Sequence, residues 1–461
     1  TSVMKRLREK DSSTSSRELP LDRGISLFQT FVRWELTQQH RLQAQGENED
    51  DRMHNLMLQR FRTEVYPLNS DEVIDYIAKR QMPRGPHDVT DTNVMTDPGW
   101  LFPTYIFTNN AQRFDFNYSQ AVNWAKFKKT PLLWWPCNVK QSELNDLGDL
   151  DKEYVFESSP VLKDMFVANA PCFLTNNVSP PKGLANGTRA RLHSLAFINP
   201  YNQHRESEKH RTYNQMKMTV LHDIKMATRN PISTNGACRI LRLTLRPSHV
   251  NVLIKSPDGQ PWAYATLPHN EGNEYGLVPI EVAKEVQNDM LSKNPNTMDE
   301  APVAHSRDDK KILLPGFVSR EMSNPGALPK RILPRHVAPQ SSLKYELGFA
   351  ITSHKGQGST LDFVIIDLSQ NPFMGFDLFM LYVALTRVRN PDKLRFLPFV
   401  EPKESWSRRL RNLKFPADLM SFLHGYDEDG IFCPKRALAW AENAAKDNRK
   451  EKKSGSRSHR A

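Results

Sequence analysis

The chain has 461 residues, of which 38% are hydrophobic and 25% charged, a composition typical of folded proteins and not of intrinsically disordered chains. Lysine and arginine number 63 against 52 acidic residues, so the net charge is +11, which favours anionic partners such as nucleic acid. The sequence contains no apolar run approaching the ~18 residues of a membrane span and no apolar leader. We therefore expect no membrane association and no secretory signal.

The N-terminal part of the chain begins with a polar segment over residues 1–23. The first residue is Thr and not Met, so we expect the chain to be a piece of a longer protein. Apolar residues at helical spacing predict a helix within residues 53–65. Asn69 followed by Glu72 is typical of a capping box and predicts the start of a second helix.

A β-prone run at residues 103–108 and a predicted helix at 117–125 form a strand–helix unit of an α/β layer. Two aromatic residues follow, Trp134 and Trp135. They would stack on bases or pack in the core, and packing is the favoured interpretation.

Alternating apolar residues predict half-buried strands over 241–245 and 250–254, so the region 151–344 is expected to be mainly β. The run 363–367 returns to the pattern of a buried strand. A helix capped by Asp377 then carries one apolar stripe, formed by Leu381, Ala384, Leu385 and Val388.

The four cysteines are scattered and none belongs to a CxxC or CxxH pair, so no zinc or other metal site is predicted. They are expected to be buried and not disulfide-bonded, as in a reducing compartment. The C-terminal tail is basic over residues 435–461. It is either a solvated tail or a segment for non-specific phosphate contact or nuclear targeting.

The segment 349–362 combines small polar residues with glycines and leads directly into the predicted strand at 363–367. Such a loop allows the backbone to approach an anionic ligand closely, and its Thr, His, Lys and Gln side chains are donors for phosphates. It lacks the spacing of a Walker A loop. The residues alone therefore predict an anion-facing loop. Further along the chain, Arg387 is expected to lie off the apolar stripe of its helix.

Segments 349–362 and 382–389 together resemble motifs V and VI of the Pif/RecD-like branch of superfamily-one DNA helicases. Further stretches are similar to the same family, namely residues 36–41 (its motif IV), 108–117, 170–177 and 183–189. In the last stretch, Gly183, Asn186 and Gly187 are expected to shape a turn. The resemblance to this family extends over residues 24–400, although residues 190–340 match it only loosely.

The resemblance implies a motor of two RecA-like domains with ATP between them, of which this chain supplies the second. The expected fold is α/β, with a parallel sheet interrupted by a β-rich insertion. The domains implied are a polar segment (1–23), a RecA-like domain in two parts (24–150 and 345–400), the insertion (151–344), a helical extension (401–434) and the basic tail (435–461).

The resemblance also implies roles for single residues. Arg41 and Arg387 would reach the γ-phosphate as catalytic residues, because charge spreads over the phosphoryl oxygens in the transition state. Gln357 and Gly358 would lie near the nucleotide. The residues expected to contact DNA are Asn109, Thr352, His354, Lys355, Tyr382, Arg389, Lys393 and Arg395.

Structural interpretations remain open beside some of these roles. Asn109 and Asn117 would contact the DNA backbone or simply cap and turn the chain. The basic residues after motif VI would follow phosphates or form a solvated face. Gly356 stands where the family usually has Ser, which would loosen the loop.

The sequence contains no Gly-Lys dipeptide, and hence no Walker A lysine. Asp71 and Glu72 open a helix after polar residues and do not match motif II, which ends an apolar strand. ATP and Mg²⁺ are therefore expected only together with a missing N-terminal RecA-like domain, itself a partner of this chain. No ATPase activity is expected from the chain alone.

The sequence thus favours the C-terminal motor portion of an ATP-dependent 5′-3′ DNA helicase that binds single-stranded DNA without sequence preference. Its expected setting is replication, recombination, repair or telomere maintenance, in the nucleus or mitochondrion. The alternatives are a non-catalytic nucleic-acid-binding remnant and the helicase part of a rolling-circle transposon. The sequence upstream of residue 1 would distinguish them.

Overall fold

The computed structural model describes residues 49–83, 97–108, 110–139, 144–180, 183–255, 275–282, 312–321, 330–337, 339–340, 343–369 and 378–455. The chain divides into two compact units, one formed by Thr1–Asp91 with Asp377–Ala461 and the other by Thr92–Phe376. None of the helices in the described ranges is long and apolar enough to cross a membrane. The domain boundaries expected from the sequence stay predictions.

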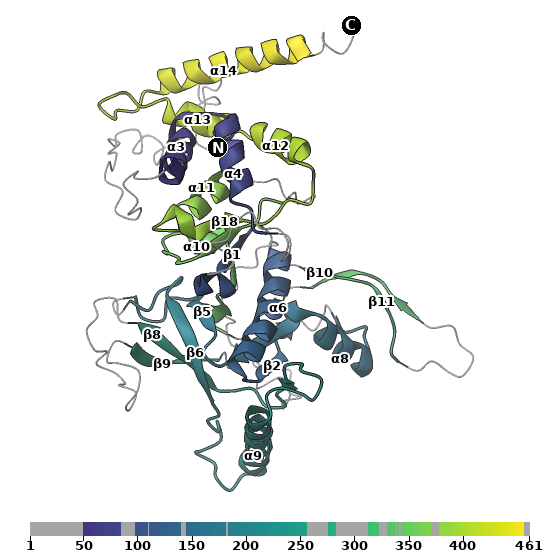
Figure 1. Cartoon of the computed structure of the whole chain (residues 1–461). Helices are drawn as coiled ribbons and strands as arrows, with labels where there is room; N and C mark the ends of the chain where they lie inside the picture. Colours follow the sequence, from purple (N-terminus) through teal and green to yellow (C-terminus); the bar gives the residue numbers. More distant parts are fainter. Residues whose placement is uncertain are drawn as a thin grey trace, which may run out of the picture. The chain divides into compact units, whose positions relative to one another are not determined.

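A parallel sheet lies in the Thr92–Phe376 unit, with β1 (Thr104–Phe107) between β16 (Ala350–Thr352) and β17 (Val364–Ile366) (Figure 1). Ile106 of β1 is opposite Ile351 on one side and Ile366 on the other. Helix α6 (Asn110–Lys128) follows β1 and contacts β16. The predicted strands at 103–108 and 363–367, the helix at 117–125 and the α/β class with a parallel sheet are confirmed.

The same unit holds a five-stranded antiparallel sheet in the order β15-β5-β6-β8-β9. Its strands are β15 (Tyr345–Leu347), β5 (Pro171–Leu174), β6 (Arg189–Ala196), β8 (His249–Lys255) and β9 (Tyr275–Glu281). A second sheet has the order β4-β2-β7, from Lys163–Val167, Leu132–Pro136 and Ile240–Arg242. One apolar core, which includes the fully buried Trp135, Tyr345 and Phe349, joins side chains of both sheets.

Shorter elements complete this unit. Two strand pairs follow one another along a two-stranded arm, β10 (Ile312–Leu314) with β13 (Arg335–Val337) and β11 (Phe317–Val318) with β12 (Arg331–Ile332) (Figure 1). Strand β3 (Asn138–Val139) pairs with β14 (Pro339–Gln340). The remaining helices are α8 (Asp149–Ser158), α9 (Glu208–Arg229), the short α10 (Ser353–Gly356) and the 3₁₀ turns η1 (Pro98–Leu101) and η2 (Pro160–Leu162).

The other unit is helical in its described part. Its elements are α3 (Glu49–Thr63), α4 (Asp71–Lys79), α11 (Leu378–Leu385), the 3₁₀ turn η6 (Pro391–Lys393), β18 (Leu394–Phe396), α12 (Lys403–Arg411), α13 (Ala417–Leu423) and α14 (Pro434–Gly455). The residues of the predicted apolar stripe, Leu381, Ala384, Leu385 and Val388, are all buried. The helix itself is shorter than predicted, because α11 ends at Leu385 and leaves Arg387 and Val388 beyond it. Its predicted cap, Asp377, lies outside the described residues.

Three local predictions need correction. Ser70, and not Asn69, caps α4, because its Oγ accepts the Val73 N–H at 3.3 Å. The strand predicted at 241–245 ends at Arg242, which is opposite Trp134 of β2. The next hydrogen bond of this parallel ladder would need an N–H at Pro136, the last residue of β2, and proline has none. The region 151–344 also contains the long helix α9.

The cysteines and tryptophans agree with expectation except at Cys433. All four cysteines are free thiols, and Cys137, Cys172 and Cys238 are buried, whereas Cys433 is only half-buried. Burial raises the pKa of the Cys172 thiol well above its usual range, so it stays protonated. Trp134 and Trp135 are 4% and 0% exposed, which confirms the packing interpretation.

Candidate nucleic-acid interface

The motif V segment contains strand β16, and its loop begins at the carboxyl end of this parallel strand. Thr352 is the last residue of β16, and the short helix α10 (Ser353–Gly356) follows immediately. Ligands of open α/β sheets bind at the carboxyl ends of the strands. The loop of the motif V segment therefore lies at the edge of the sheet where such ligands bind.

The side chains predicted to contact ligand differ in exposure within this segment. Thr352 is buried, whereas His354, Gln357 and Gly358 are exposed. Gly358 has φ +86° with open space around its α-carbon, so a side chain there is disfavoured by the backbone conformation and not by a neighbour. The segment thus presents backbone and polar groups at the surface.

Gly356 has a defined place in the loop. It is buried, and its carbonyl oxygen accepts hydrogen bonds from the Ser359 N–H at 3.2 Å and the Ser359 hydroxyl at 2.7 Å. These bonds close the turn that follows α10.

The backbone of β16 is held by Asn117 of α6. Its Nδ2 donates to the Ala350 carbonyl at 2.8 Å, and its Oδ1 accepts the Ala350 N–H at 2.9 Å. Asn117 is 4% exposed. Of the two interpretations open for Asn117, the structure supports the structural one, because the amide satisfies backbone groups of strand β16.

Lys355 belongs to a three-residue ion network. Its ammonium group pairs with the Glu346 carboxylate, which also pairs with the buried guanidinium of Arg113. Burial raises the pKa of Glu346, but the charges and hydrogen bonds of Arg113 and Lys355 outweigh that effect and hold the pKa below its usual range. Glu346 is therefore ionised at neutral pH, and its carboxylate lies between the side chains of Arg113 and Lys355. No sequence pattern relates Glu346 to Arg113, because 233 positions separate them.

Arg189 is the last residue of the stretch 183–189, for which the sequence predicted only a turn. It begins β6, and its guanidinium donates to the Thr360 carbonyl and to Asp362 Oδ2, both at 3.1 Å. The turn before it contains Gly183 at φ +75° and Gly187 at φ +88°, as expected for residues that shape a turn. The structure therefore brings this turn segment next to motif V, which sequence spacing did not indicate.

The motif VI arginine follows α11 in the other unit. Arg387 is 6% exposed, and its Nε donates to the Val383 carbonyl at 2.6 Å, while Nη2 donates to the Thr386 hydroxyl at 2.6 Å. Tyr382 accepts a hydrogen bond from Arg62 at 3.4 Å and packs its ring against Phe61. Helix α3 thus supports the first turn of motif VI.

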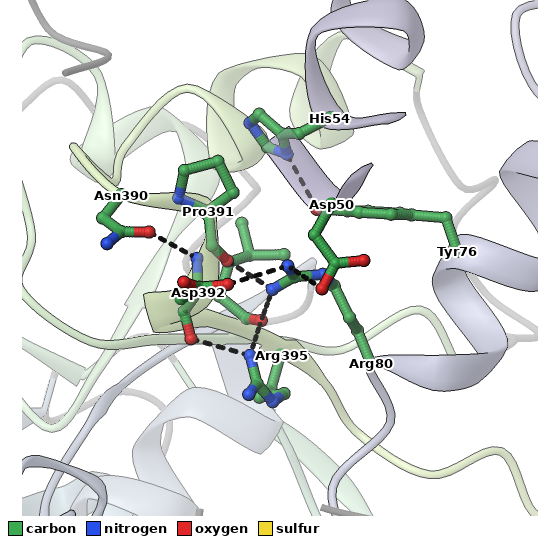
Figure 2. A network of polar contacts seen from close by, with 9 residues as sticks. Asp50, His54, Tyr76, Arg80, Asn390, Pro391, Asp392 and Arg395 are labelled. Atoms are coloured by element: carbon green, nitrogen blue, oxygen red, sulfur yellow. Dashed lines mark hydrogen bonds and ion pairs between the residues drawn. The ribbon is translucent and has the colours of Figure 1, made fainter. Parts of the chain in front are cut away.

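A buried polar network fixes the chain after motif VI (Figure 2). The Arg80 guanidinium, 4% exposed, donates to the Pro391 carbonyl at 2.5 Å. It also forms ion pairs with Asp50 at 3.0 Å and Asp392 at 3.2 Å. Arg395, 5% exposed, donates to the carbonyls of Asp392 and Leu394 at 2.8 Å each. A buried cation with this many acceptors is well compensated.

The remaining predicted residues fall into three groups. Arg389 is exposed and Lys393 half-buried, so both reach the surface, whereas the contacts of Arg395 lie inside the chain. Arg41 and Asn109 lie outside the described residues. Within the described ranges, no group of three or more His, Cys, Asp or Glu side chains could hold a metal ion.

Comparison with known proteins gives similarity to solved structures alone. No protein-family model matches the chain, and no curated protein matches it significantly. A Pif1 helicase from Candida albicans is 14% identical at a TM-score of 0.30, with 77% of this chain and 54% of that chain covered. Bacteroides Pif1 in complex with ADP-AlF3 and ssDNA is 14% identical at a TM-score of 0.37, with 85% and 56% covered.

Bacteroides Pif1 bound to ssDNA is a third similar structure, 13% identical at a TM-score of 0.35, with 83% of this chain and 55% of that chain covered. These matches are Pif1 helicases, the family that motifs V and VI resemble. The chain spans about half the length of the solved structures it matches.

Proposed function

We propose that this chain is the C-terminal motor portion of an ATP-dependent DNA helicase that moves 5′ to 3′. The observation that carries the proposal is the position of motif V at the carboxyl end of β16, in a parallel sheet, with Lys355 and the exposed Gln357 beside it. The net charge of +11 agrees with a polyanionic partner. Replication, recombination, repair and telomere maintenance are the processes in which such a motor acts.

In the proposed motor, Arg387 stabilises the charge that develops on the γ-phosphoryl group once the N-terminal RecA-like domain supplies ATP and Mg²⁺. Arginine suits this role because its guanidinium is planar and always protonated. The Val383 carbonyl and Thr386 hydroxyl hold the Arg387 guanidinium by two hydrogen bonds. Those acceptors limit its rotamers before nucleotide binds.

In the same proposal, Lys355 contacts the phosphates of single-stranded DNA, and the exposed His354 and Gln357 provide further donors. Contacts of this kind position a strand without reading its sequence, because phosphates are identical along the chain. Binding is therefore expected to be non-specific and strongly dependent on salt concentration.

Binding of a fluorescent thymidine oligonucleotide, followed by anisotropy over a series of salt concentrations, tests the proposal. We expect Lys355→Ala to weaken binding and to reduce the slope of log affinity against log salt by about 0.7, because one phosphate of the single strand is then no longer neutralised. Lys209→Ala, on the exposed surface of α9, is the matched control and should leave the slope unchanged.

The wild-type chain provides the decisive result. Absence of salt-dependent single-strand binding at low ionic strength would reject the proposed DNA interface. Binding with an unchanged slope in Lys355→Ala would reject the assignment of this residue. A non-catalytic remnant would bind equally, so the sequence upstream of residue 1 must also encode a G-x-x-x-x-G-K-[ST] loop for the motor assignment to hold.

A further inference from the structure

The loop of the motif V segment is attached to the five-stranded sheet at two points. At the start of the loop, Lys355 of α10 pairs with Glu346 of β15. At its end, the Thr360 carbonyl and the Asp362 carboxylate accept hydrogen bonds from Arg189 of β6, both at 3.1 Å. The loop that contains Gln357 and Gly358 lies between these two attachments along the chain.

The two attachment points belong to one row of the sheet. Glu346 is directly opposite Phe173 of β5, and Phe173 is directly opposite Arg189. Directly opposed residues of antiparallel strands project to the same face. Glu346, Phe173 and Arg189 therefore share a face of the sheet, and we refer to them as the anchor row.

The backbone beneath the anchor row is fixed on several strands. Strand β6 pairs with β5 on one side and with β8 on the other, and β5 pairs also with β15. Phe173 is 8% exposed, and its ring lies close to the α-carbon of Gly348. Paired strands and a packed ring give the anchor row a rigid base, whereas the loop that it holds is short and contains glycines.

The two attachments differ in environment. Arg113 is 3% exposed and balances the charge of Glu346 from the protein interior. The negative charge of Glu346 is therefore compensated while Glu346 pairs with Lys355. Arg189 and Asp362 are 47% and 76% exposed, so their ion pair is weak on its own. The hydrogen bond from Arg189 to the Thr360 carbonyl adds a contact that depends on the conformation of the loop.

We propose that the anchor row positions the motif V loop for phosphate contact, so that the five-stranded sheet sets the affinity of this motor half for single-stranded DNA. The inference rests on the proposed function, since it takes motif V as the DNA-contacting segment. Glu346 and Arg189 are positioning residues, because they act through Lys355 and the loop and do not touch the DNA themselves.

The first experiment follows hydrogen–deuterium exchange of a peptide covering residues 350–362 in the full chain, without DNA. We expect faster exchange in this peptide in Arg189→Ala and in Glu346→Gln, with the exchange of α9 unchanged. Arg191→Ala is the matched control, because Arg191 is the next exposed position on the same strand. Glu346→Gln keeps an oxygen acceptor for Arg113, which guards against unfolding. Unchanged exchange in both variants would overturn the proposal.

The second experiment measures the dissociation constant for a thymidine oligonucleotide in Arg189→Asp, Asp362→Arg and the double variant. Each single reversal places like charges together, and we expect about three- to fivefold weaker binding, the range of an exposed ion pair. The double variant restores opposite charges and should return within about twofold of wild type. Failure of the double variant to recover, with its fold intact by circular dichroism, contradicts positioning by this pair.

The salt dependence separates positioning from direct contact. If Arg189 is a positioning residue, Arg189→Ala lowers the affinity for DNA and leaves the slope of log affinity against log salt unchanged. A slope reduced by about 0.7 would make Arg189 itself a phosphate contact and overturn its positioning role. If the wild-type chain binds no DNA, the proposed function fails. If the variants exchange faster but bind DNA with unaltered affinity, only the proposal that the anchor row sets DNA affinity is refuted.

Discussion

His54 is a neutral imidazole inside the polar network that supports motif VI. Its Nδ1 lies 2.9 Å from the Tyr76 hydroxyl, and both side chains are buried (Figure 2). Burial, with a further contribution from the charge of Arg80, lowers the pKa of His54 to about 4, although the backbone of Leu385 acts in the opposite direction. The imidazole is thus kept uncharged across the physiological range.

The lowered pKa of His54 predicts a loss of stability in mild acid. Between pH 6.5 and about 4 the unfolded chain binds a proton at this histidine while the folded chain does not. The free energy of unfolding should therefore fall as pH falls through this window, by about 3 kcal/mol in total. Urea unfolding at pH 7 and pH 4.5 should show a smaller loss in His54→Gln than in wild type.

His222→Gln is the control for this titration, because His222 is exposed on α9. It should lose stability in acid as much as wild type does. An equal loss in His54→Gln and wild type would show that His54 titrates normally in the folded chain.

Among the elements, the junction of α6 with β16 depends on a single side chain. Asn117 satisfies both the N–H and the carbonyl of Ala350, two groups that are buried and belong to the strand leading into motif V. Asn117→Ala leaves both groups without this partner, and an unsatisfied buried polar group costs about 1–3 kcal/mol. We therefore expect a loss of unfolding free energy in the upper part of that range, measured by urea denaturation.

A matched variant tests the cause of that loss. Asn123→Ala removes an asparagine side chain from the same helix at a position where no hydrogen bond to β16 is formed by the described side chains. Its effect should stay below about 0.5 kcal/mol, as for ordinary surface substitutions. Similar losses in the two variants would assign the effect to helix propensity and not to the Ala350 contacts.

Elements with a strong local pattern were predictable from the sequence. The run that forms β17 is continuously apolar, and the stripe of α11 follows the helical period, so each signal is contained within a few residues. Helix α9 was not predicted, because Tyr213, Val220 and Ala227 are its only fully buried residues in the described structure. One buried position in every two turns gives too weak a periodicity.

The candidate site was predictable only where its residues are neighbours in sequence. Motif V was found because its loop directly precedes a strand. Glu346 and Arg113 are 233 positions apart, and Arg189 and Asp362 are 173 apart, so no local pattern relates them. The cap of α4 shows the same limit at short range, because Asn69 and Ser70 are both good caps and only the backbone conformation selects Ser70.

At the scale of the whole molecule, the proposed motor lacks one part of a phosphoryl-transfer site in this sequence. Arg387 and, by resemblance, Arg41 are the cations proposed to stabilise transition-state charge, whereas the Gly-Lys dipeptide of a phosphate-binding loop is absent from all 461 residues. Without a phosphate-binding loop to hold ATP, the transition state does not form, and the arginine has no developing charge to stabilise. The chain alone should therefore hydrolyse no ATP above background, with or without single-stranded DNA and Mg²⁺.

A coupled assay of phosphate release tests this prediction in two forms of the protein. In the 461-residue chain, hydrolysis that single-stranded DNA stimulates and Arg387→Ala abolishes would contradict it. In a longer form that carries a Walker A loop, Arg387→Ala should reduce kcat by about 10³-fold or more, the range found for arginine fingers. DNA affinity should be unchanged, because the loss concerns the transition state. Arg387→Lys should recover little of the activity, since an ammonium group lacks the planar fork of donors.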